Sequence, residues 1–292
     1  MYYTGEHLYR IIANNIYKIP HDIKGVIAIA RGGLFPGFII SEHFNIPITT
    51  LDKFIENQQT CWFNESTTIK FNEIINGKLL IVDDSIDTGN SIYAAMEKIK
   101  NISNFYTFSF IYAAIHSTYL RFDNLIVLDD KQESFRLYEF NLFRTYIFNN
   151  VVTDLDGVLC IDPKWGLDTK ENEYIDFINT APKYLNIPSI DIILTSRLEK
   201  YRKQTEDWLY KNNIKYNKLI MSPLENINDK LLLMKENKWS DAIWKCNEYK
   251  NICGNQQRIP VMIESNLFDA QYIKQNFNNG IIFCTDKNCF IE

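Results

Sequence analysis

Residues 79–91 read LLIVDDSIDTGNS, and this stretch decides how the first half of the chain folds. The four apolar residues 79–82 predict a strand that is buried on both faces, as in a parallel sheet covered by helices. Asp83 and Asp84 follow at the carboxyl end of this strand, and a helix is predicted over 90–100. Ligands bind at that end of the strands in open α/β sheets. The stretch therefore predicts an α/β fold with a ligand site beside the acidic pair.

The loop between this strand and helix has groups that suit a phosphate. Gly89 permits close approach of the backbone, and the hydroxyls of Thr88 and Ser91 can donate hydrogen bonds. The N-terminus of the following helix directs its N–H groups outward. The acidic pair next to the loop can accept hydrogen bonds from two neighbouring hydroxyls. A phosphate beside a diol describes a ribose 5-phosphate, so we expect a ligand of this kind.

The block resembles the phosphoribosyl-pyrophosphate (PRPP) motif of the type I phosphoribosyltransferases in its apolar run, acidic pair, short loop and Thr-Gly step. The resemblance implies that Asp83 and Asp84 hold the ribose hydroxyls. It implies transfer of the phosphoribosyl group to or from a nucleobase-like acceptor. It also implies that the 5-phosphate is wrapped by five loop residues: Asp87, Thr88, Gly89, Asn90 and Ser91.

A second motif lies about fifty residues before the acidic pair. Residues 25–30 predict a buried strand, a helix is predicted over 35–44, and Arg31, Gly32 and Gly33 stand between them. This is where the resembled family keeps its pyrophosphate loop. The resemblance therefore implies that the backbone amides and the arginine of this loop hold the leaving pyrophosphate.

Two other families share part of this pattern. A response-regulator receiver also has an acidic pair after an apolar strand, but it would begin near that strand and leave the upstream Arg-Gly-Gly loop unexplained. A nucleotide kinase would need GxxxxGK[ST], which is absent. Residues 138–141 could stack on a base or belong to the core, and the core interpretation is favoured. A loop covering PRPP is expected within 53–73, with Lys53 and Lys70 as candidate phosphate contacts.

The second half of the chain has its own acidic motif, DLDGVL, at residues 154–159. It follows the apolar residues 151–153, and a spacing of two places Asp154 and Asp156 on the same face at the end of that strand. One carboxylate can then attack phosphorus while the other transfers a proton. The motif resembles the DxDGVL signature of the haloacid-dehalogenase (HAD) superfamily, which implies a phosphatase that forms an aspartyl-phosphate.

The other motifs of this superfamily can be placed in order along the chain. Thr195, with Ser196 as its alternative, ends an apolar strand and implies a hydroxyl for the phosphoryl oxygens. Lys245 is preferred to Lys230 and Lys250 as the lysine that stabilises transition-state charge. A degenerate copy without activity is the alternative interpretation of the motif set.

The resemblance implies Mg²⁺ held by the Asp154 carboxylate, the Asp156 backbone carbonyl and Glu264. Glu264 is followed by Ser265, which departs from the common acidic pair of the fourth motif, and Asp269 is a candidate helper ligand. Only about forty residues separate Asp156 from the second motif. The implied fold is therefore a Rossmann-like HAD domain without a large cap.

The chain has 292 residues, a length that suits two domains. We expect a phosphoribosyltransferase-like domain over 1–145 and a HAD-like phosphatase domain over 146–292. Each is expected to be α/β, with a largely parallel sheet flanked by helices. Further strands are predicted over 105–114, 124–128, 191–194, 219–221, 261–263 and 280–284, and further helices over 6–17, 171–179, 199–211 and 229–237.

Composition excludes several other classes of protein. A hydrophobic fraction of 46% argues against disorder, and 36 acidic against 31 basic residues argue against binding nucleic acid through its phosphates. The N-terminus lacks a signal-peptide profile and the longest apolar stretch is too short to span a membrane. We therefore expect a cytoplasmic protein with no membrane partner, and a homodimer as its candidate assembly.

These patterns together predict a bifunctional enzyme. It would use PRPP and a nucleobase-like acceptor, and would hydrolyse a phosphate monoester, with the nucleotide product as a candidate substrate. The alternative is a PRPP-binding regulatory module, without transferase activity, that controls the phosphatase.

Overall fold

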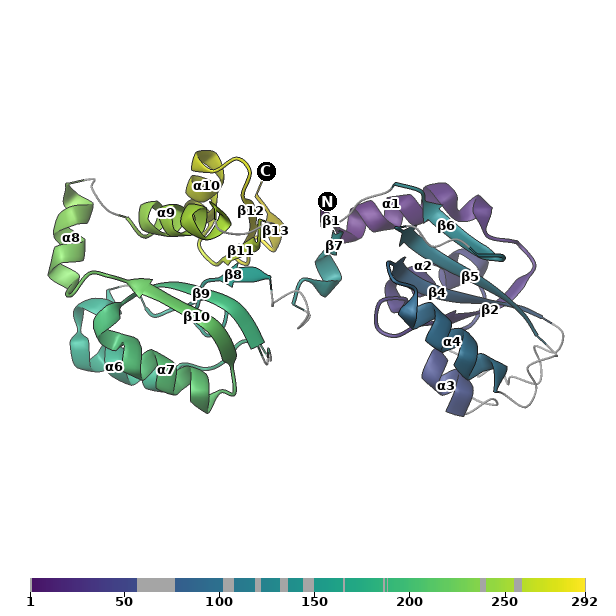
Figure 1. The fold of residues 1–292 in the computed structure, drawn as a ribbon, viewed down its shortest axis with the longest axis horizontal. Coiled ribbons are helices and arrows are strands. Elements are labelled where there is room, and N and C mark those ends of the chain that lie inside the picture. Colours follow the sequence, from purple (N-terminus) through teal and green to yellow (C-terminus); the bar gives the residue numbers. More distant parts are fainter. Residues whose placement is uncertain are drawn as a thin grey trace. The chain divides into compact units, whose positions relative to one another are not determined.

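The structure is a computed structural model that describes residues 2–56, 77–101, 108–118, 122–131, 136–143, 150–164, 166–185, 187, 189–236, 240–254 and 259–291. The chain divides into two compact units, Met1–Leu142 and Phe143–Glu292 (Figure 1). The predicted boundary between residues 145 and 146 lies outside the described residues.

The first unit is built on a five-stranded parallel sheet with the order β3-β2-β4-β5-β6. Its strands are β2 (Ile23–Ala28), β3 (Ile48–Thr50), β4 (Lys78–Ile86), β5 (Ser109–Ser117) and β6 (Leu125–Asp129). Its helices are α1 (Gly5–Asn15), α2 (Leu34–Phe44), α3 (Leu51–Glu56) and α4 (Asn90–Lys100). A separate two-stranded ribbon pairs β1 (Tyr2–Tyr3) with β7 (Leu137–Tyr138).

Both faces of this sheet are buried, which explains the continuous apolar run of β4. Leu80 and Val82 pack in a cluster with residues of α1 and α2. Leu79 and Ile81 alternate with them and pack in a second cluster with residues of α3 and α4. Successive side chains of a strand point to opposite faces, so one apolar run fills both layers.

The connections of the first sheet place its ligand position between β2 and β4. From β2 the chain passes to the edge strand β3 and then returns to β4 on the other side of β2. This reversal of direction is the topological switch point, where open α/β sheets bind ligands outside the carboxyl ends of the strands. The Arg-Gly-Gly loop follows β2 and the acidic pair ends β4, so both motifs lie at that point.

The second unit is built on a six-stranded sheet with the order β10-β9-β8-β11-β12-β13, in which only β13 is antiparallel to its neighbour among the described pairings. Its strands are β8 (Val151–Thr153), β9 (Ser189–Leu198), β10 (Lys215–Ser222), β11 (Val261–Glu264), β12 (Ile281–Cys284) and β13 (Cys289–Phe290). Its helices are α6 (Glu171–Thr180), α7 (Arg202–Lys211), α8 (Ile227–Lys235), α9 (Asp241–Gly254) and α10 (Leu267–Asn276).

Helices cover both faces of the second sheet, with α9 and α10 on one side and α6 and α7 on the other (Figure 1). The side of α9 and α10 includes a buried cluster around Trp244, Tyr249 and Met262. The chain reverses between β8 and β11, which gives this sheet a switch point of its own. The predicted α/β class with parallel sheets flanked by helices is confirmed.

Several elements differ from their predicted ranges. The strand predicted over 25–30 ends at Ala28, where the chain turns into the Arg-Gly-Gly loop, and the peptide between Ala30 and Arg31 is cis. The helix predicted over 199–211 begins as a 3-10 turn, so α7 itself starts at Arg202. None of the described helices is long and apolar enough to cross a bilayer.

Candidate functional sites

The Arg-Gly-Gly loop lies in contact with the end of β4. The N–H of Gly33 donates to the Ile29 carbonyl oxygen at 2.8 Å, and a Cβ on Gly33 would overlap the Val82 carbonyl oxygen. A Cβ on Gly32 would lie 2.6 Å from the carboxyl group of Asp84. The two motifs are therefore assembled side by side, and at Gly33 a side chain would collide with the backbone of β4.

The acidic pair is buried at the carboxyl end of β4. Asp83 and Asp84 are 7% and 6% exposed. The N–H of Asp84 donates to Asp83 Oδ1 at 2.9 Å, and the N–H of Ser85 donates to Asp84 Oδ1 at 2.7 Å. These backbone bonds orient the two carboxylates, which suits acceptors that must meet two hydroxyls of one ligand.

The loop after β4 ends at a glycine that starts α4. Gly89 has φ +83°, a left-handed conformation that favours glycine, and it is the N-cap residue of α4. The Asn90 N–H lies 3.4 Å from the Thr88 hydroxyl oxygen, and the Tyr93 N–H donates to the Gly89 carbonyl at 2.9 Å. Because the cap residue has no side chain, the first turn of α4 presents backbone N–H groups to an anion.

An arginine that the sequence patterns did not indicate reaches this loop. Nη2 of Arg136 contacts Asp87 Oδ1 and also donates to the Thr118 hydroxyl at 2.8 Å. That hydroxyl donates to Asp87 Oδ1 at 2.6 Å. Asp87 is therefore tied to the ends of β5 and β7 as well as to its own loop.

In the segment 138–141, for which stacking on a base or a place in the core was considered, Tyr138 belongs to the core. The Tyr138 hydroxyl lies 2.8 Å from His116 Nδ1, and both rings are fully buried. Burial raises the pKa of the Tyr138 hydroxyl, and the nearby Asp84 adds to this effect. Phe140 stacks on Tyr138 with ring centroids 5.5 Å apart and is 37% exposed.

Of the two lysines expected to contact phosphate, Lys53 lies in α3 and pairs with Glu56 at 2.9 Å. Lys70 lies outside the described residues, as does most of the expected covering loop.

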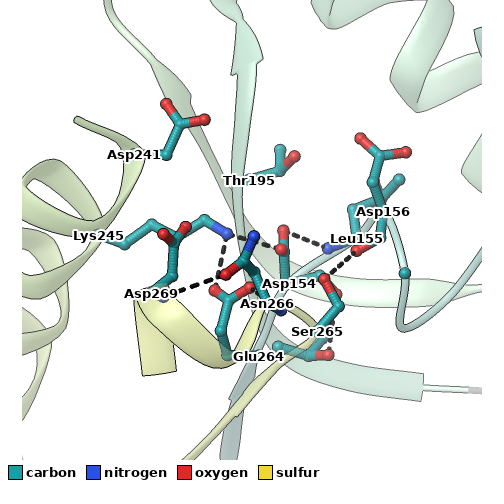
Figure 2. Close-up of polar contacts among 12 residues, drawn as sticks. Asp154, Leu155, Asp156, Thr195, Asp241, Lys245, Glu264, Ser265, Asn266 and Asp269 are labelled. Carbon is teal, nitrogen blue, oxygen red and sulfur yellow. Dashed lines mark hydrogen bonds and ion pairs between the residues drawn. The ribbon is translucent and has the colours of Figure 1, made fainter. Parts of the chain in front are cut away.

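The acidic motif of the second unit meets a lysine and a glutamate at the switch point. Lys245 Nζ lies 2.6 Å from Asp154 Oδ2 and 2.7 Å from Glu264 Oε2, as Figure 2 shows. Glu264 is 0% exposed and the other two are also buried. These side chains come from α9, the end of β8 and the end of β11. The fold thus brings together three residues that span more than a hundred positions of the sequence, from Asp154 to Glu264.

Burial and charge act against each other in this triad. For Lys245, burial alone would lower the pKa, but the carboxylates of Asp154 and Glu264 outweigh it and raise the pKa well above its ordinary value. For Asp154, burial raises the pKa and Glu264 adds to that, while Lys245 opposes both. We infer that Lys245 remains an ammonium, because it is the cation shared by two buried carboxylates.

Asp156 faces a different partner, again an arginine that the patterns did not indicate. Arg197 donates from Nε to Asp156 Oδ2 at 2.9 Å and from Nη2 to Oδ1 at 2.6 Å, a bidentate pair. Arg197 is 2% exposed, and its Nη1 lies 3.4 Å from the Thr205 hydroxyl. The bidentate geometry fixes the direction of the Asp156 carboxylate.

A cavity of about 190 Å³ joins these groups. Thr195 and Ser196 line it, together with Asp154, Asp156 and Lys245. Two carboxyl groups at its wall have pKa values raised to about 6: burial and the Asp154 charge act on Asp162, and burial acts on Asp269. Its other lining residues are Pro163, Asp168, Tyr174, Arg197, Leu198, Tyr201, Ile227, Lys230, Asp241, Glu264, Ser265 and Asn266.

The two other candidate lysines lie apart from the nucleophile position. Lys230 lines the cavity but pairs with both carboxylate oxygens of Asp241, at 2.8 and 2.9 Å. Lys250 is exposed and does not line the cavity.

The predicted Mg²⁺ ligands all lie on residues that line the cavity. Asp154, Glu264 and the Asp156 carbonyl are oxygen donors on one wall, which is the chemistry that Mg²⁺ prefers. The Asp156 carbonyl oxygen accepts from the Ser265 hydroxyl at 3.2 Å. Within the described residues, no three His, Cys, Asp or Glu side chains form a metal-binding group. The predicted set has only two such side chains and one backbone carbonyl, and its oxygen donors suit Mg²⁺ by chemical type.

Comparisons with known proteins agree with the geometry of the first site. The family model of the phosphoribosyl transferase domain matches residues 1–104. This match supports the predicted type I phosphoribosyltransferase domain at the N-terminus.

The individual relatives are shorter matches. Xanthine-guanine phosphoribosyltransferase of Chromohalobacter salexigens is 31% identical over 83 residues, which covers 28% of this chain and 49% of the relative. The enzyme of the same name from Idiomarina loihiensis is 32% identical over 79 residues, covering 26% and 48%. The chain thus spans about half the length of the curated relatives it matches.

Among solved structures, the purine phosphoribosyltransferase of Pyrococcus horikoshii is similar over 47% of this chain and 91% of its own. It is 19% identical with a TM-score of 0.33.

Proposed function

We propose that the first unit transfers the phosphoribosyl group of PRPP to, or from, a purine-like base. The observation that supports this most directly is the contact between the Arg-Gly-Gly loop and Asp84 at the switch point of the sheet. The relatives that match this part of the chain are named xanthine-guanine phosphoribosyltransferases, which favours a purine as the acceptor.

Each part of the proposed site has a separate task. Asp83 and Asp84 accept hydrogen bonds from the ribose hydroxyls, and the loop 87–91 with the start of α4 binds the 5-phosphate. Arg31, Gly32 and Gly33 offer an arginine and backbone amides to the pyrophosphate. Negative charge beside the ribose stabilises the positive charge that develops as the bond to pyrophosphate breaks. Bound Mg²⁺ would offset the charge of the pyrophosphate group.

The test of this proposal is release of pyrophosphate from PRPP in the presence of a panel of purine and pyrimidine bases. Asp83→Asn together with Asp84→Asn removes two charged acceptors, each worth about 1.5–3 kcal/mol. We expect PRPP binding measured by calorimetry to weaken by more than about tenfold. The matched control is Asp52→Asn, an exposed aspartate of α3 that pairs with Lys98. Unchanged PRPP affinity in the double variant would refute both the transferase and its regulatory alternative.

The regulatory alternative keeps PRPP binding and omits the transfer. It predicts that PRPP binds but releases no pyrophosphate with any base, and that PRPP alters the rate of phosphate-ester hydrolysis by the second unit. The base panel therefore separates the two interpretations.

We also propose that the second unit is a HAD-like, Mg²⁺-dependent phosphatase. The supporting observation is Lys245 Nζ held between Asp154 and Glu264 at 2.6 and 2.7 Å. Because β8 and β11 flank the switch point, they bring these carboxylates to the edge where an α/β sheet binds its ligand.

The proposed reaction follows from the residues at the cavity. Asp154 attacks phosphorus and forms an aspartyl-phosphate, and the leaving alkoxide takes a proton. In this proposal Asp156 enters the reaction as the carboxylic acid, gives that proton, and then takes one from the water that hydrolyses the intermediate. Thr195 and Lys245 stabilise the phosphoryl oxygens. Mg²⁺, bound by Asp154, the Asp156 carbonyl and Glu264, would shield the anionic nucleophile from the anionic ester.

This proposal is tested with p-nitrophenyl phosphate and Mg²⁺. Asp154→Asn should reduce hydrolysis by more than about a thousandfold, since the amide cannot form the aspartyl-phosphate. Asp191→Asn is the matched control, because Asp191 lies on β9 away from the cavity and bonds Asn217 at 3.0 Å. Turnover by Asp154→Asn at the wild-type rate would show that Asp154 is not the nucleophile.

A further inference from the structure

Arg136 is a buried cation that the proposed reaction does not use directly. Its side chain is 3% exposed, whereas the Asp87 carboxylate that it contacts is 65% exposed. The same Nη2 atom donates to the Thr118 hydroxyl at 2.8 Å, and this hydroxyl donates onward to Asp87 at 2.6 Å. Arginine, hydroxyl and carboxylate thus form a closed triangle at the first residue of the phosphate loop.

The triangle joins three segments of the first unit. Asp87 follows β4, Thr118 follows β5, and Arg136 precedes β7. The N–H of Thr118 also donates to the Ile86 carbonyl at 3.0 Å, which extends the link between the ends of β4 and β5. The start of the phosphate loop is therefore held from two sides.

The segment that carries Arg136 is itself anchored. β7 pairs with β1, with Tyr2 opposite Leu137, and the N–H of Gly5 donates to Glu139 Oε2 at 2.7 Å. Because β1 and the start of α1 hold both ends of this short strand, Arg136 approaches Asp87 from a fixed position. A guanidinium held in this way loses little conformational freedom when it binds a carboxylate.

Charge gives a reason for the triangle. An ionised carboxylate only accepts hydrogen bonds, so Asp87 beside a phosphate would repel it unless its charge were offset. Arg136 supplies that offset from the protein side and leaves the hydroxyls and N–H groups of residues 88–91 to face the ligand. The contribution of Asp87 is then to the shape of the loop.

We propose that Arg136 is a positioning residue of the phosphate subsite, which acts through Asp87 to hold the loop 87–91 in the conformation that binds the 5-phosphate of PRPP. The inference rests on the proposed PRPP site. It assigns to Arg136, directly before β7, a part in ligand binding that the two sequence motifs do not require.

Calorimetry with two probes tests this proposal on the full chain. In the proposed site PRPP places its 5-phosphate in the loop 87–91, whereas inorganic pyrophosphate with Mg²⁺ has no 5-phosphate and should bind on the Arg-Gly-Gly side. Arg136→Met should weaken PRPP binding by about tenfold and leave pyrophosphate binding within about twofold of wild type. Arg136→Lys should recover part of the loss, since the charge is restored without the fork. Arg10→Met is the control, because Arg10 is exposed on α1 and pairs with Glu6 at 2.7 Å.

A double-variant cycle shows whether Arg136 acts through Asp87. Asp87→Asn, made on an exposed side chain, should also weaken PRPP binding, and adding Arg136→Met to it should cause no further loss. Unchanged PRPP affinity in Arg136→Met would overturn the proposal, as would an equal loss for pyrophosphate or a further loss in the Asp87→Asn background. If the wild-type protein binds no PRPP, the proposed function of the site fails instead.

Discussion

At the scale of single residues, the first site depends on two glycines whose lack of a side chain allows close packing. Gly32 and Gly33 let the Arg-Gly-Gly loop approach the end of β4. A side chain would collide there with Asp84 or with the backbone at Val82. A flexible carboxylate can turn aside from a new methyl group, whereas a carbonyl oxygen within a strand cannot. The cost of adding a methyl group should therefore be greater at Gly33 than at Gly32.

Gly33→Ala should lower the free energy of unfolding by about 1–3 kcal/mol, the usual cost of overpacking, and should abolish measurable PRPP binding. Urea denaturation and calorimetry measure the two effects. The control is Gly254→Ala at the end of α9, where a Cβ meets no atom within 4 Å. An alanine in a helix is favoured over glycine, so this control should be neutral or slightly stabilising. A Gly33→Ala protein as stable as the control would show that the loop does not approach β4 this closely.

The sequence indicated these residues because their types are rare in that order, but it did not indicate Arg136 or Arg197. Both arginines are nearly fully buried, although arginine is among the residues most often exposed. Their partners, Asp87 and Asp156, lie 49 and 41 positions away. Only the strand order brings these pairs together, so no local pattern could have indicated them.

At the scale of helices and strands, the elements around the sites differ in how clearly the sequence encodes them. In β4 the apolar run 79–82 precedes the acidic pair, and β8 directly precedes Asp154. The predicted ranges of these strands lie within or match the observed ones. α9 was not predicted, because its buried face includes Lys245 and so breaks the apolar period. α10 was also missed, although Asn266 directly before it is a typical N-cap residue and accepts from the N–H groups of Phe268 and Asp269.

The first turn of α10 sets two electrostatic effects against each other at Asp269. A helix N-terminus stabilises a nearby carboxylate, by about 0.3–1 kcal/mol. Burial opposes this and is the larger effect, because the pKa of Asp269 is raised to about 6; Lys245 opposes the rise and Asp241 adds to it. The folded pKa thus lies above the unfolded value of 3.8. The stability that this group contributes is complete below pH 3.8 and is lost as the pH rises through about 6.

Asp269→Asn should therefore raise the free energy of unfolding at pH 8, by about 1–2 kcal/mol after allowance for partial solvent exposure, and the gain should disappear near pH 4. Urea denaturation at the two pH values measures it. Asp229→Asn provides the matched control, because Asp229 occupies the same position behind the cap Asn226 in α8 but is exposed. A gain of equal size at pH 4 and pH 8 would contradict the electrostatic origin.

At the scale of the whole molecule, the two units share one sheet architecture but differ in strand order. Both units have a largely parallel sheet buried on both faces, and both place their acidic motif at the carboxyl end of a strand that borders the switch point. The periodicity of the sequence predicts such sheets but not their strand order, because order depends on which connections cross the sheet. The motifs predicted where in the sequence the candidate sites lie. The strand order explains why the motifs of each unit lie next to one another.

The presence of both sites in one chain leads to a prediction about products. With PRPP and guanine, a bifunctional chain should form the nucleotide at the first site and remove its phosphate at the second, so that the nucleoside accumulates. Asp154→Asn should stop at the nucleotide, and Asp83→Asn with Asp84→Asn should form neither product. Mass spectrometry of the mixture separates the three results. If the wild-type chain hydrolyses p-nitrophenyl phosphate but accumulates nucleotide as Asp154→Asn does, the second site acts on another phosphate ester.

Pyrophosphate should be released in an amount equal to the sum of nucleotide and nucleoside, because each transfer breaks one bond between ribose and pyrophosphate. Its absence in every variant, with hydrolysis that still responds to PRPP, would favour the regulatory alternative over the bifunctional enzyme.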